Sequence, residues 1–262
     1  MTNSELNLHI ISWILVSTRI GAFFINAPIF GSAAIPPNLK GYFTAILAYF
    51  IYQSPQVHML EQMPQMWDLM MLLIKETTVG VVIAMLTHLI YVPMQIVGEQ
   101  IGQSSGLGQA QIFNPDEEYD FTVLEQIIYT VAILIFLGLN GHHLILNAFI
   151  KSYDYIPLGE IALSGYVLKV FIAYFTKTFY LGIAFAAPIL GCLLIVSIGM
   201  GLLSKSVPQM NLLIIDLPLR VLIAFLGILF ALPIMIMLFK KLIFNTMPYV
   251  EKIIFAMSKG AS

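Results

Sequence analysis

Charged side chains inside apolar blocks are the residues of this sequence whose type and spacing could do chemistry. Arg19 interrupts the first block, Lys75 and Glu76 adjoin near the start of the third, and Asp216 and Arg220 lie four positions apart in the last. An unpaired Arg at the centre of a membrane helix costs ~2.5–3.5 kcal/mol, so Arg19 must face a partner. Adjacent residues point about 100° apart on a helix, so Lys75 and Glu76 cannot pair with each other. Each therefore needs a partner elsewhere in the protein or in another chain.

Two other groups could carry chemistry, but each has an ordinary explanation. The i,i+4 spacing of Asp216 and Arg220 lets them pair on one helix face, where they would simply neutralise each other. His142 and His143 are adjacent, whereas two metal ligands on one helix are spaced by three or four residues so that both rings face one point. The histidines therefore do not predict a metal site.

One stretch, Gly98–Pro115, differs in composition from everything around it. It carries four Gln and four Gly and is followed by an acidic run. Its unpaired backbone groups could not face lipid, so we expect a solvated loop or a segment that lines a water-filled cavity. An ordinary loop between two helices is the competing interpretation.

The composition places the chain in a membrane. At 59% hydrophobic and 10% charged residues, it differs strongly from soluble domains, which are roughly 45–50% apolar and about 25% charged. Four intervals without Asp, Glu, Lys or Arg reach the ~17–25 residues that a helix needs to cross about 30 Å of hydrocarbon. These intervals are Thr77–Gly98, Gln126–Ile150, Thr178–Ser204 and Val221–Phe239.

The distribution of charge and cysteine narrows the function classes. The net charge of −2 gives no indication of nucleic-acid binding. Lys240, Lys241, Lys252 and Lys259 all follow the last apolar block, and the positive-inside bias then predicts a cytoplasmic C-terminus. A single cysteine, Cys192, excludes an intramolecular disulfide.

The apolar blocks predict an all-α, membrane-associated helical protein with about six hydrophobic segments. The blocks are Leu6–Phe30, Gly41–Tyr52, Trp67–Val97, Phe121–Phe149, Tyr166–Leu203 and Leu212–Phe239. The second block is short for a membrane span. We expect the fifth to be broken at Pro188 and its glycines, and the sixth to be bent at Pro218 and Pro233.

Metalloprotease and phosphate-loop motifs are missing from the sequence. It contains no His-Glu-x-x-His and no phosphate-binding Gly-x-x-x-x-Gly-Lys-Ser/Thr. The pattern Gly-x-Ser-x-Gly occurs once, at Gly102–Gly106, but no predicted strand precedes it, as the nucleophile turn of a hydrolase would require. We therefore expect no catalytic activity and no cofactor. Three classes remain: a small-solute carrier, a membrane-embedded hydrolase, or a subunit of a larger channel. Carriers often contain paired repeats, and no second stretch has the composition of the Gly/Gln segment.

Several stretches, in order, resemble the FliR family, the flagellar export-gate subunit, to which the SctT group of injectisomes is related. They are Arg19-Ile-Gly-Ala-Phe-Phe-Ile-Asn-Ala-Pro-Ile-Phe-Gly31, Lys75-Glu76, Gly98-Glu-Gln-Ile-Gly102, Leu139-Asn-Gly-His142, and Pro188 through Gly201-Leu-Leu-Ser-Lys-Ser-Val-Pro-Gln-Met-Asn211. The Ala-Pro-Ile-Phe-Gly opening is more similar to flagellar members. Asp216 departs from the pattern, since an uncharged residue is expected there.

The resemblance implies a structural and gating subunit of the type III protein export channel. FliP and FliQ would be its direct partners in the bacterial inner membrane at the flagellar basal body, with FlhB and FlhA near by, exported flagellar proteins passing through, and lipid around the assembly. Residues 1–164 would be FliP-like and residues 165–262 FliQ-like. An injectisome gate subunit is the first alternative, and a small-solute carrier is a weaker one.

The resemblance and the buried charges together predict three groups of site residues. The plug of the channel would include Gly102, Gly106, Leu107, Gly108, Gln109, Ala110, Ile112 and Phe113. Assembly would depend on Arg19, Lys75, Glu76, Asp216 and Arg220. The turn of the C-terminal helical hairpin would contain Pro208, Gln209 and Asn211.

Overall fold

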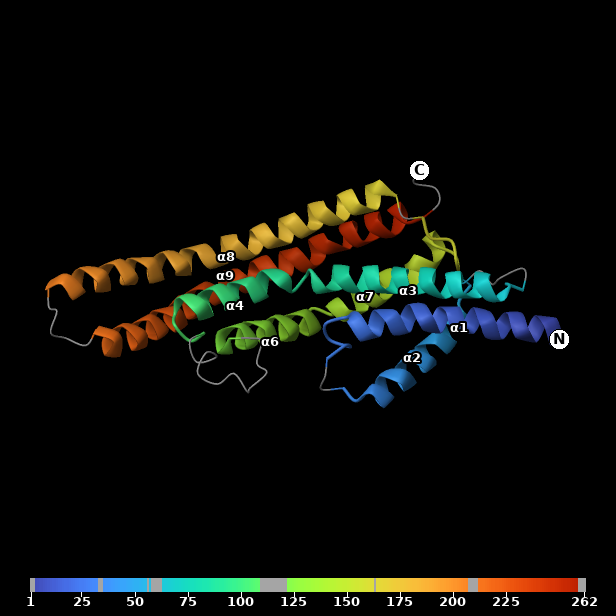
Figure 1. Cartoon of the computed structure of the whole chain (residues 1–262), viewed down its shortest axis with the longest axis horizontal. Coiled ribbons are helices and arrows are strands. Elements are labelled where there is room, and N and C mark those ends of the chain that lie inside the picture. Colours follow the sequence, from blue (N-terminus) through green and yellow to red (C-terminus); the bar gives the residue numbers. More distant parts are fainter. Residues whose placement is uncertain are drawn as a thin grey trace. The chain divides into compact units, whose positions relative to one another are not determined.

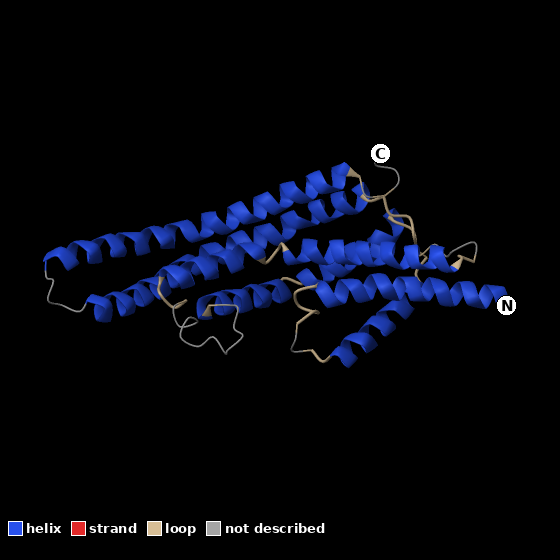
Figure 2. Ribbon diagram, in the orientation of Figure 1, coloured by secondary structure: helices blue, strands red, loops and turns tan. Residues whose placement is uncertain are grey.

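The computed structural model describes residues 3–32, 35–55, 57, 63–108, 122–162, 164–206 and 212–258, and the elements in these ranges are helices joined by loops (Figures 1 and 2). In chain order the helices are α1 (Asn3–Asn26), α2 (Pro37–Tyr52), α3 (Met66–His88), α4 (Val92–Ser104), α6 (Val123–Gly138), α7 (Gly141–Tyr155), α8 (Gly165–Ser206) and α9 (Leu212–Ala256). The predicted all-α fold class is confirmed for the described residues.

The chain divides into two compact units, each assembled from separate segments. The first consists of Met1–Leu89, Asn140–Tyr174 and Asn245–Ser262, and the second of Ile90–Leu139 and Phe175–Phe244. α8 and α9 contribute to both. These units describe packing, whereas the division at residue 164 rests on likeness to FliP and FliQ, and that division stays a prediction.

In the first unit, α1 packs closely along α3. A Cβ at Gly80 would overlap the carbonyl oxygen of Arg19 and lie 2.9 Å from the Cβ of Ala22. The missing side chain therefore lets the two helix backbones approach each other, as small residues do at membrane helix interfaces. Buried apolar residues of α1, among them Leu15, Val16 and Phe23, form the core beside this contact.

In the second unit, α4 packs against the start of α6 through two glycines. A Cβ at Gly98 would overlap the backbone of Glu125, and one at Gly102 would lie 2.8 Å from the Cβ of Thr122. The expectation of a non-helical segment from residue 98 onward is therefore wrong for 98–104, which belong to α4. Glycines four positions apart lie on one helix face, and here that face is used for packing.

Two short breaks separate consecutive helices. Residues 89–91 separate α3 from α4, and Pro93 lies in the first turn of α4, where its missing N–H removes no helical bond. Between α6 and α7 the chain bends by 69°, and Asn140 adopts a left-handed conformation with φ of 57°. By contrast, α8 continues through Pro188 as one helix, so the expected interruption there is not observed.

In the part of the chain that the structure describes, four helices are long and apolar enough to cross a membrane, or up to five if the bent pair α6–α7 forms one span. The four stretches are Leu6–Asn26, Met66–His88, Gly165–Ser206 and Ile214–Ala256. α2, with 16 residues, is shorter than the ~17–25 residues that a span needs. The predicted count of about six hydrophobic segments thus reduces to four or five candidate spans plus α2.

The contact at Gly80 yields a first prediction. Gly80→Ala should separate α1 from α3 and lower the free energy of unfolding by ~1–3 kcal/mol, as overpacking does. Gly191→Ala is the matched control, because Gly191 is also helical and nothing lies within 4 Å of a Cβ there. That change should be neutral or stabilise by ~0.5–1 kcal/mol. Thermal unfolding of the purified chain in detergent measures both, and equal midpoints would contradict the proposed close contact.

Candidate functional site: a buried ion pair and the base of the Gly/Gln stretch

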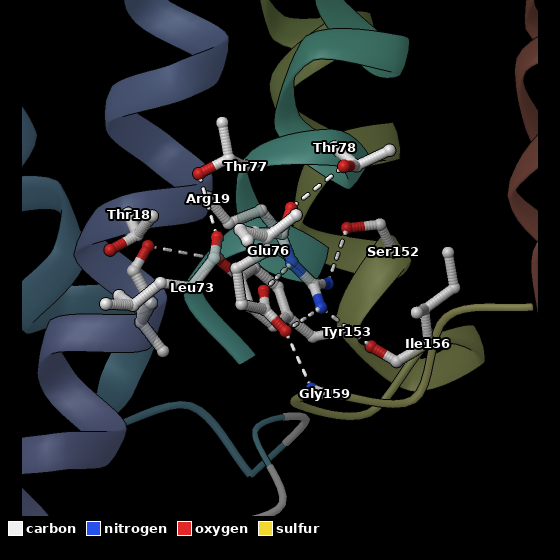
Figure 3. A network of polar contacts seen from close by, with 12 residues as sticks. Thr18, Arg19, Leu73, Glu76, Thr77, Thr78, Ser152, Tyr153, Ile156 and Gly159 are labelled. Atoms are coloured by element: carbon white, nitrogen blue, oxygen red, sulfur yellow. Dashed lines mark hydrogen bonds and ion pairs between the residues drawn. The ribbon is translucent and has the colours of Figure 1, made fainter. Parts of the chain in front are cut away.

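Arg19 on α1 and Glu76 on α3 form a two-pronged ion pair inside the first unit (Figure 3). The Arg19 Nε donates to Glu76 Oε2 at 2.5 Å, and its Nη2 donates to Glu76 Oε1 at 3.1 Å. The two side chains are 0% and 1% exposed. The planar guanidinium matches a carboxylate in this bidentate geometry, which Lys could not reproduce. The expectation that Arg19 faces a partner is therefore met within the chain.

The turn that follows α7 completes the shell around the pair. The second terminal nitrogen of Arg19, Nη1, donates to Ser152 Oγ at 3.3 Å, and Nη2 also donates to the carbonyl of Ile156 at 3.1 Å. The backbone N–H of Gly159 donates to Glu76 Oε1 at 2.8 Å. Lys75, which points elsewhere on α3, donates from Nζ to the carbonyl of Gly159 at 3.1 Å. The adjacent Lys75 and Glu76 thus hold the same turn from two sides.

Tyr153 covers the ion pair on one face. The Arg19 Cζ lies 4.2 Å from the centroid of the Tyr153 ring, a cation–π arrangement. The Tyr153 hydroxyl donates to the carbonyl of Val16, one turn before Arg19 on α1, at 3.4 Å. Tyr153 therefore links α7 to α1 while it shields the charged groups from the surrounding apolar core.

Glycine is required in this turn as well. Gly159 has φ of +78°, a backbone region that L side chains rarely adopt, and a Cβ there would overlap the side chain of Leu72. Any other residue would push the turn away from Glu76 and break the bond from the Gly159 N–H. The Arg19 cluster, defined here as Arg19, Lys75, Glu76, Ser152, Tyr153, Ile156 and Gly159, thus joins α1, α3, α7 and the turn after α7.

The Arg19 cluster holds helices together. Arg19 and Glu76 neutralise each other, Lys75 donates to a backbone carbonyl, and each nitrogen of the Arg19 guanidinium donates to a protein group. The neighbouring Thr18, Thr77 and Thr78 bond the carbonyls of their own helices. In the described residues, no three His, Cys, Asp or Glu side chains come together to hold a metal.

The base of the Gly/Gln stretch is a second organised region. Thr122 Oγ1 accepts the backbone N–H of Glu125 at 3.2 Å, as an N-cap does, and donates to the carbonyl of Gly98 at 3.4 Å. On the other side, the N–H of Gly108 donates to the carbonyl of Gly102 at 3.2 Å. Residues 108 and 122, which flank the undescribed part of the stretch, are therefore both tied to α4.

Gly106 allows the turn that ends α4. Its φ of +87° lies in the region that glycine favours, and a Cβ there would lie 2.9 Å from the side chain of Leu217 on α9. Of the predicted plug residues, Gly102 is buried in α4, and Gly106, Leu107 and Gly108 form the turn after it. Four others lie outside the described residues: Gln109, Ala110, Ile112 and Phe113. The predicted hairpin turn, Pro208, Gln209 and Asn211, lies outside them too.

Asp216 and Arg220 pair on α9 as their spacing predicts. The Arg220 Nε lies 2.7 Å from Asp216 Oδ1, and the side chains are 27% and 23% exposed. Because about a quarter of each side chain is exposed, the protein encloses this pair less completely than it encloses Arg19 and Glu76. That all five charges contribute to assembly with other chains stays a prediction.

Sequence reasoning missed Ser152, Tyr153, Gly159 and Thr122. Neither Ser152 nor Tyr153 belongs to a motif that the sequence analysis could use. Thr122 precedes an apolar block and has an acidic residue three positions later, Glu125, which is the signature of a capping box. That signal was present in the sequence and could have located the start of α6.

The fold and the site together define a class of protein, namely an all-α membrane protein in which buried charged residues join the helices. Residues 10–246 match the family of bacterial export proteins, family 1, and the chain belongs to that family.

Among its relatives are three proteins named "Flagellar biosynthetic protein FliR". That of Bacillus subtilis (strain 168) is 27% identical over 82% of this chain and 83% of its own length. Those of Aquifex aeolicus (strain VF5) and Escherichia coli (strain K12) are 25% and 24% identical, over 86% and 82% of this chain and 86% and 80% of their own lengths. The predicted FliR resemblance is confirmed, and the chain is an export-family membrane protein of flagellar biosynthesis.

The Arg19 cluster yields a second prediction. Arg19→Met should destabilise the chain by ~3–5 kcal/mol, because it leaves the Glu76 carboxylate buried without its cation. Arg220→Met is the matched control and should cost about 0–1 kcal/mol, since its pair is partly exposed. Thermal unfolding in detergent compares the two.

The double variant Arg19→Met/Glu76→Leu provides the decisive check. It removes both charges and should recover part of the stability lost in Arg19→Met. If Glu76→Leu lowers the stability of the Arg19→Met variant as much as it lowers that of the unmodified chain, the two residues are not energetically coupled.

Proposed function

We propose that this chain is a structural and gating subunit of the flagellar type III protein export channel. It assembles with FliP and FliQ into the entry gate for unfolded export substrates at the basal body in the inner membrane, close to FlhB and FlhA. It performs no catalysis of its own. The names of the relatives favour the flagellum over the injectisome, which remains the alternative.

The length of α8 and α9 is the observation that carries this proposal. At about 1.5 Å per residue, their 42 and 45 residues extend over about 63 and 67 Å, roughly twice the ~30 Å hydrocarbon layer. Observed tilts reach only about 40°, which lengthens the path across the layer to about 39 Å. At least a third of each helix therefore has to lie outside hydrocarbon.

Both helices are apolar and exposed over most of that length. Ile195 on α8 is 71% exposed and Phe230 on α9 is 78% exposed, and similar side chains continue along both helices. Contiguous apolar surface of this size outside lipid marks a protein interface. Unlike subunits with apolar helices of comparable length would cover it, which fits a hetero-oligomeric gate better than a carrier that works alone.

The base of the Gly/Gln stretch supports the gating part of the proposal. The stretch leaves α4 and returns to α6 at points held by Thr122, Gly98 and Gly102. Such an arrangement fixes both ends of a segment whose composition suits a wet channel. We propose that Gly106–Phe113 plugs the channel at rest.

Co-purification tests the proposed partners. When the chain is tagged and produced together with FliP and FliQ, all three should elute as one complex in mild detergent, because the apolar faces of α8 and α9 need cover. Elution of the tagged chain alone, as a monomer or homo-oligomer that binds a small solute, would favour the carrier. The tagged chain produced without FliP and FliQ is the control for aggregation.

A deletion tests the plug. Removal of Gln103–Ile112 should leave the complex assembled but raise its conductance to ions in planar bilayers, because the channel loses its obstruction. Replacement of the same residues by a Gly/Ser linker of equal length is the matched control and should leak as well, since it restores the connection without the side chains. An assembled deletion complex as tight as the wild type would make the stretch a connector only.

A further inference from the structure

The start of α8 and the end of α9 lie side by side (Figure 1), and they form an open groove with the end of α7. Its volume of about 560 Å³ is within the ~300–1,000 Å³ that ligand pockets occupy. Six described residues of the first unit, called here the aromatic groove, line it: Tyr155 of α7, Tyr166 of α8, and Pro248, Glu251, Lys252 and Phe255 of α9. None of them belongs to the Arg19 cluster or to the Gly/Gln stretch.

Flat rings form the walls of the aromatic groove. Tyr155, Tyr166 and Phe255 are 43%, 51% and 52% exposed, although each carries a large apolar surface. The rings of Tyr155 and Phe255 meet edge to face, with their centroids 6.3 Å apart. Pro248 adds a fourth flat ring to the lining. A ligand that covers these rings removes their apolar surface from water, which favours binding.

Contacts within the first unit hold the helices that carry these rings. The backbone N–H of Ala162, in the segment that leads into α8, donates to the carbonyl of Met257 at 2.8 Å. One turn into α8, the Tyr174 hydroxyl bonds Thr246 Oγ1 at 2.8 Å. The Tyr174 ring also stacks on Tyr249, with centroids 5.0 Å apart. The walls are therefore fixed before a ligand arrives, so binding costs little conformational entropy in the protein.

Exposed charges at the groove indicate that it lies in water. Lys151 on α7 and Glu251 on α9 form an ion pair at 3.7 Å, and their side chains are 55% and 53% exposed. The neighbouring Lys252 is exposed too. Charged side chains that face lipid tails are costly, so a lipid acyl chain is a poor candidate for the ligand. The groove therefore fits a ligand from the aqueous phase.

The polar groups of the lining are mainly hydrogen-bond donors. The hydroxyls of Tyr155 and Tyr166 can each donate one proton, and the Lys252 ammonium can donate three. The carboxylate in the lining, that of Glu251, is already paired with Lys151. A cationic ligand is therefore disfavoured, since it would meet one ammonium in the groove and would compete with another for the carboxylate. The matching ligand offers flat apolar groups together with hydrogen-bond acceptors.

We propose that the aromatic groove binds a proline-rich segment of another protein in the polyproline II conformation. Proline has an apolar ring and a carbonyl but no backbone N–H, so it offers acceptors without donors. Its rings would pack against Tyr155, Tyr166 and Phe255, while the hydroxyls and Lys252 donate to its carbonyls. Proline-rich segments dock in aromatic-lined grooves because their conformation is formed in advance. At 3.1 Å per residue, three or four prolines extend about 9–12 Å. The proposal does not depend on the export-channel assignment.

Peptide binding to the full-length chain tests the proposal. The chain in detergent is titrated against a fluorescent peptide of ten prolines, and fluorescence anisotropy gives Kd. A Gly/Ser peptide of equal length should bind at least tenfold more weakly. Phe255→Ala should weaken binding of the proline peptide at least tenfold, as the loss of an aromatic anchor does. Tyr166→Phe keeps the ring and removes one donor, so it should weaken binding about two- to tenfold.

Phe43→Ala is the matched control, because Phe43 on α2 is an exposed aromatic residue of the same unit, 57% exposed, outside the groove. It should change Kd by less than about twofold. Equal losses in Phe43→Ala and Phe255→Ala would overturn the proposal, since the peptide would then adhere to any exposed ring. Equal affinity for the two peptides, or no binding of the proline peptide at millimolar concentration, would overturn it as well. Displacement of the proline peptide by tetramethylammonium would make the groove a cation site instead.

Discussion

The ion pair between Arg19 and Glu76 is the constraint on which the first unit depends. Removing an ion from water costs several kcal/mol, and mutual attraction offsets this only when geometry and hydrogen bonding are both good. Here the carboxylate is held by the guanidinium and by the Gly159 N–H, and these bonds require α1, α3 and the turn after α7 at fixed separations. Gly80 and Gly159 are the positions where a side chain would prevent those separations.

In the second unit, α4 and α6 approach each other closely through glycines and a threonine hydroxyl. Gly98 and Gly102 bring α4 onto the start of α6, and Thr122 uses one hydroxyl to cap α6 and to bond α4. Backbone contact of this kind is possible because the missing side chains leave room, and a hydroxyl in an apolar surrounding is best satisfied by a carbonyl near by. Residues 108 and 122 are consequently tied to α4 by a backbone bond and a hydroxyl bond.

Local features could be predicted from the sequence, whereas long-range partners could not. The apolar blocks predicted that the elements are helices, and the i,i+4 spacing predicted the Asp216–Arg220 pair. The cost of a buried charge predicted that Arg19 needs a partner, but Glu76 lies 57 positions away, and only packing of α1 on α3 selects it. Gly98 and Gly102 were assigned to a loop because composition alone cannot distinguish glycines that break a helix from glycines that let another helix approach.

Lipid and protein must share the surface of the α8–α9 hairpin, and its dimensions indicate how. A bilayer accommodates about half of each helix, whereas exposed apolar side chains continue along both, among them Leu168 and Ile195 on α8 and Phe230 on α9. Water is an unfavourable neighbour for side chains of this size. The part of each helix that lipid does not surround therefore needs cover from other protein, because these helices are apolar over about twice the thickness of a membrane.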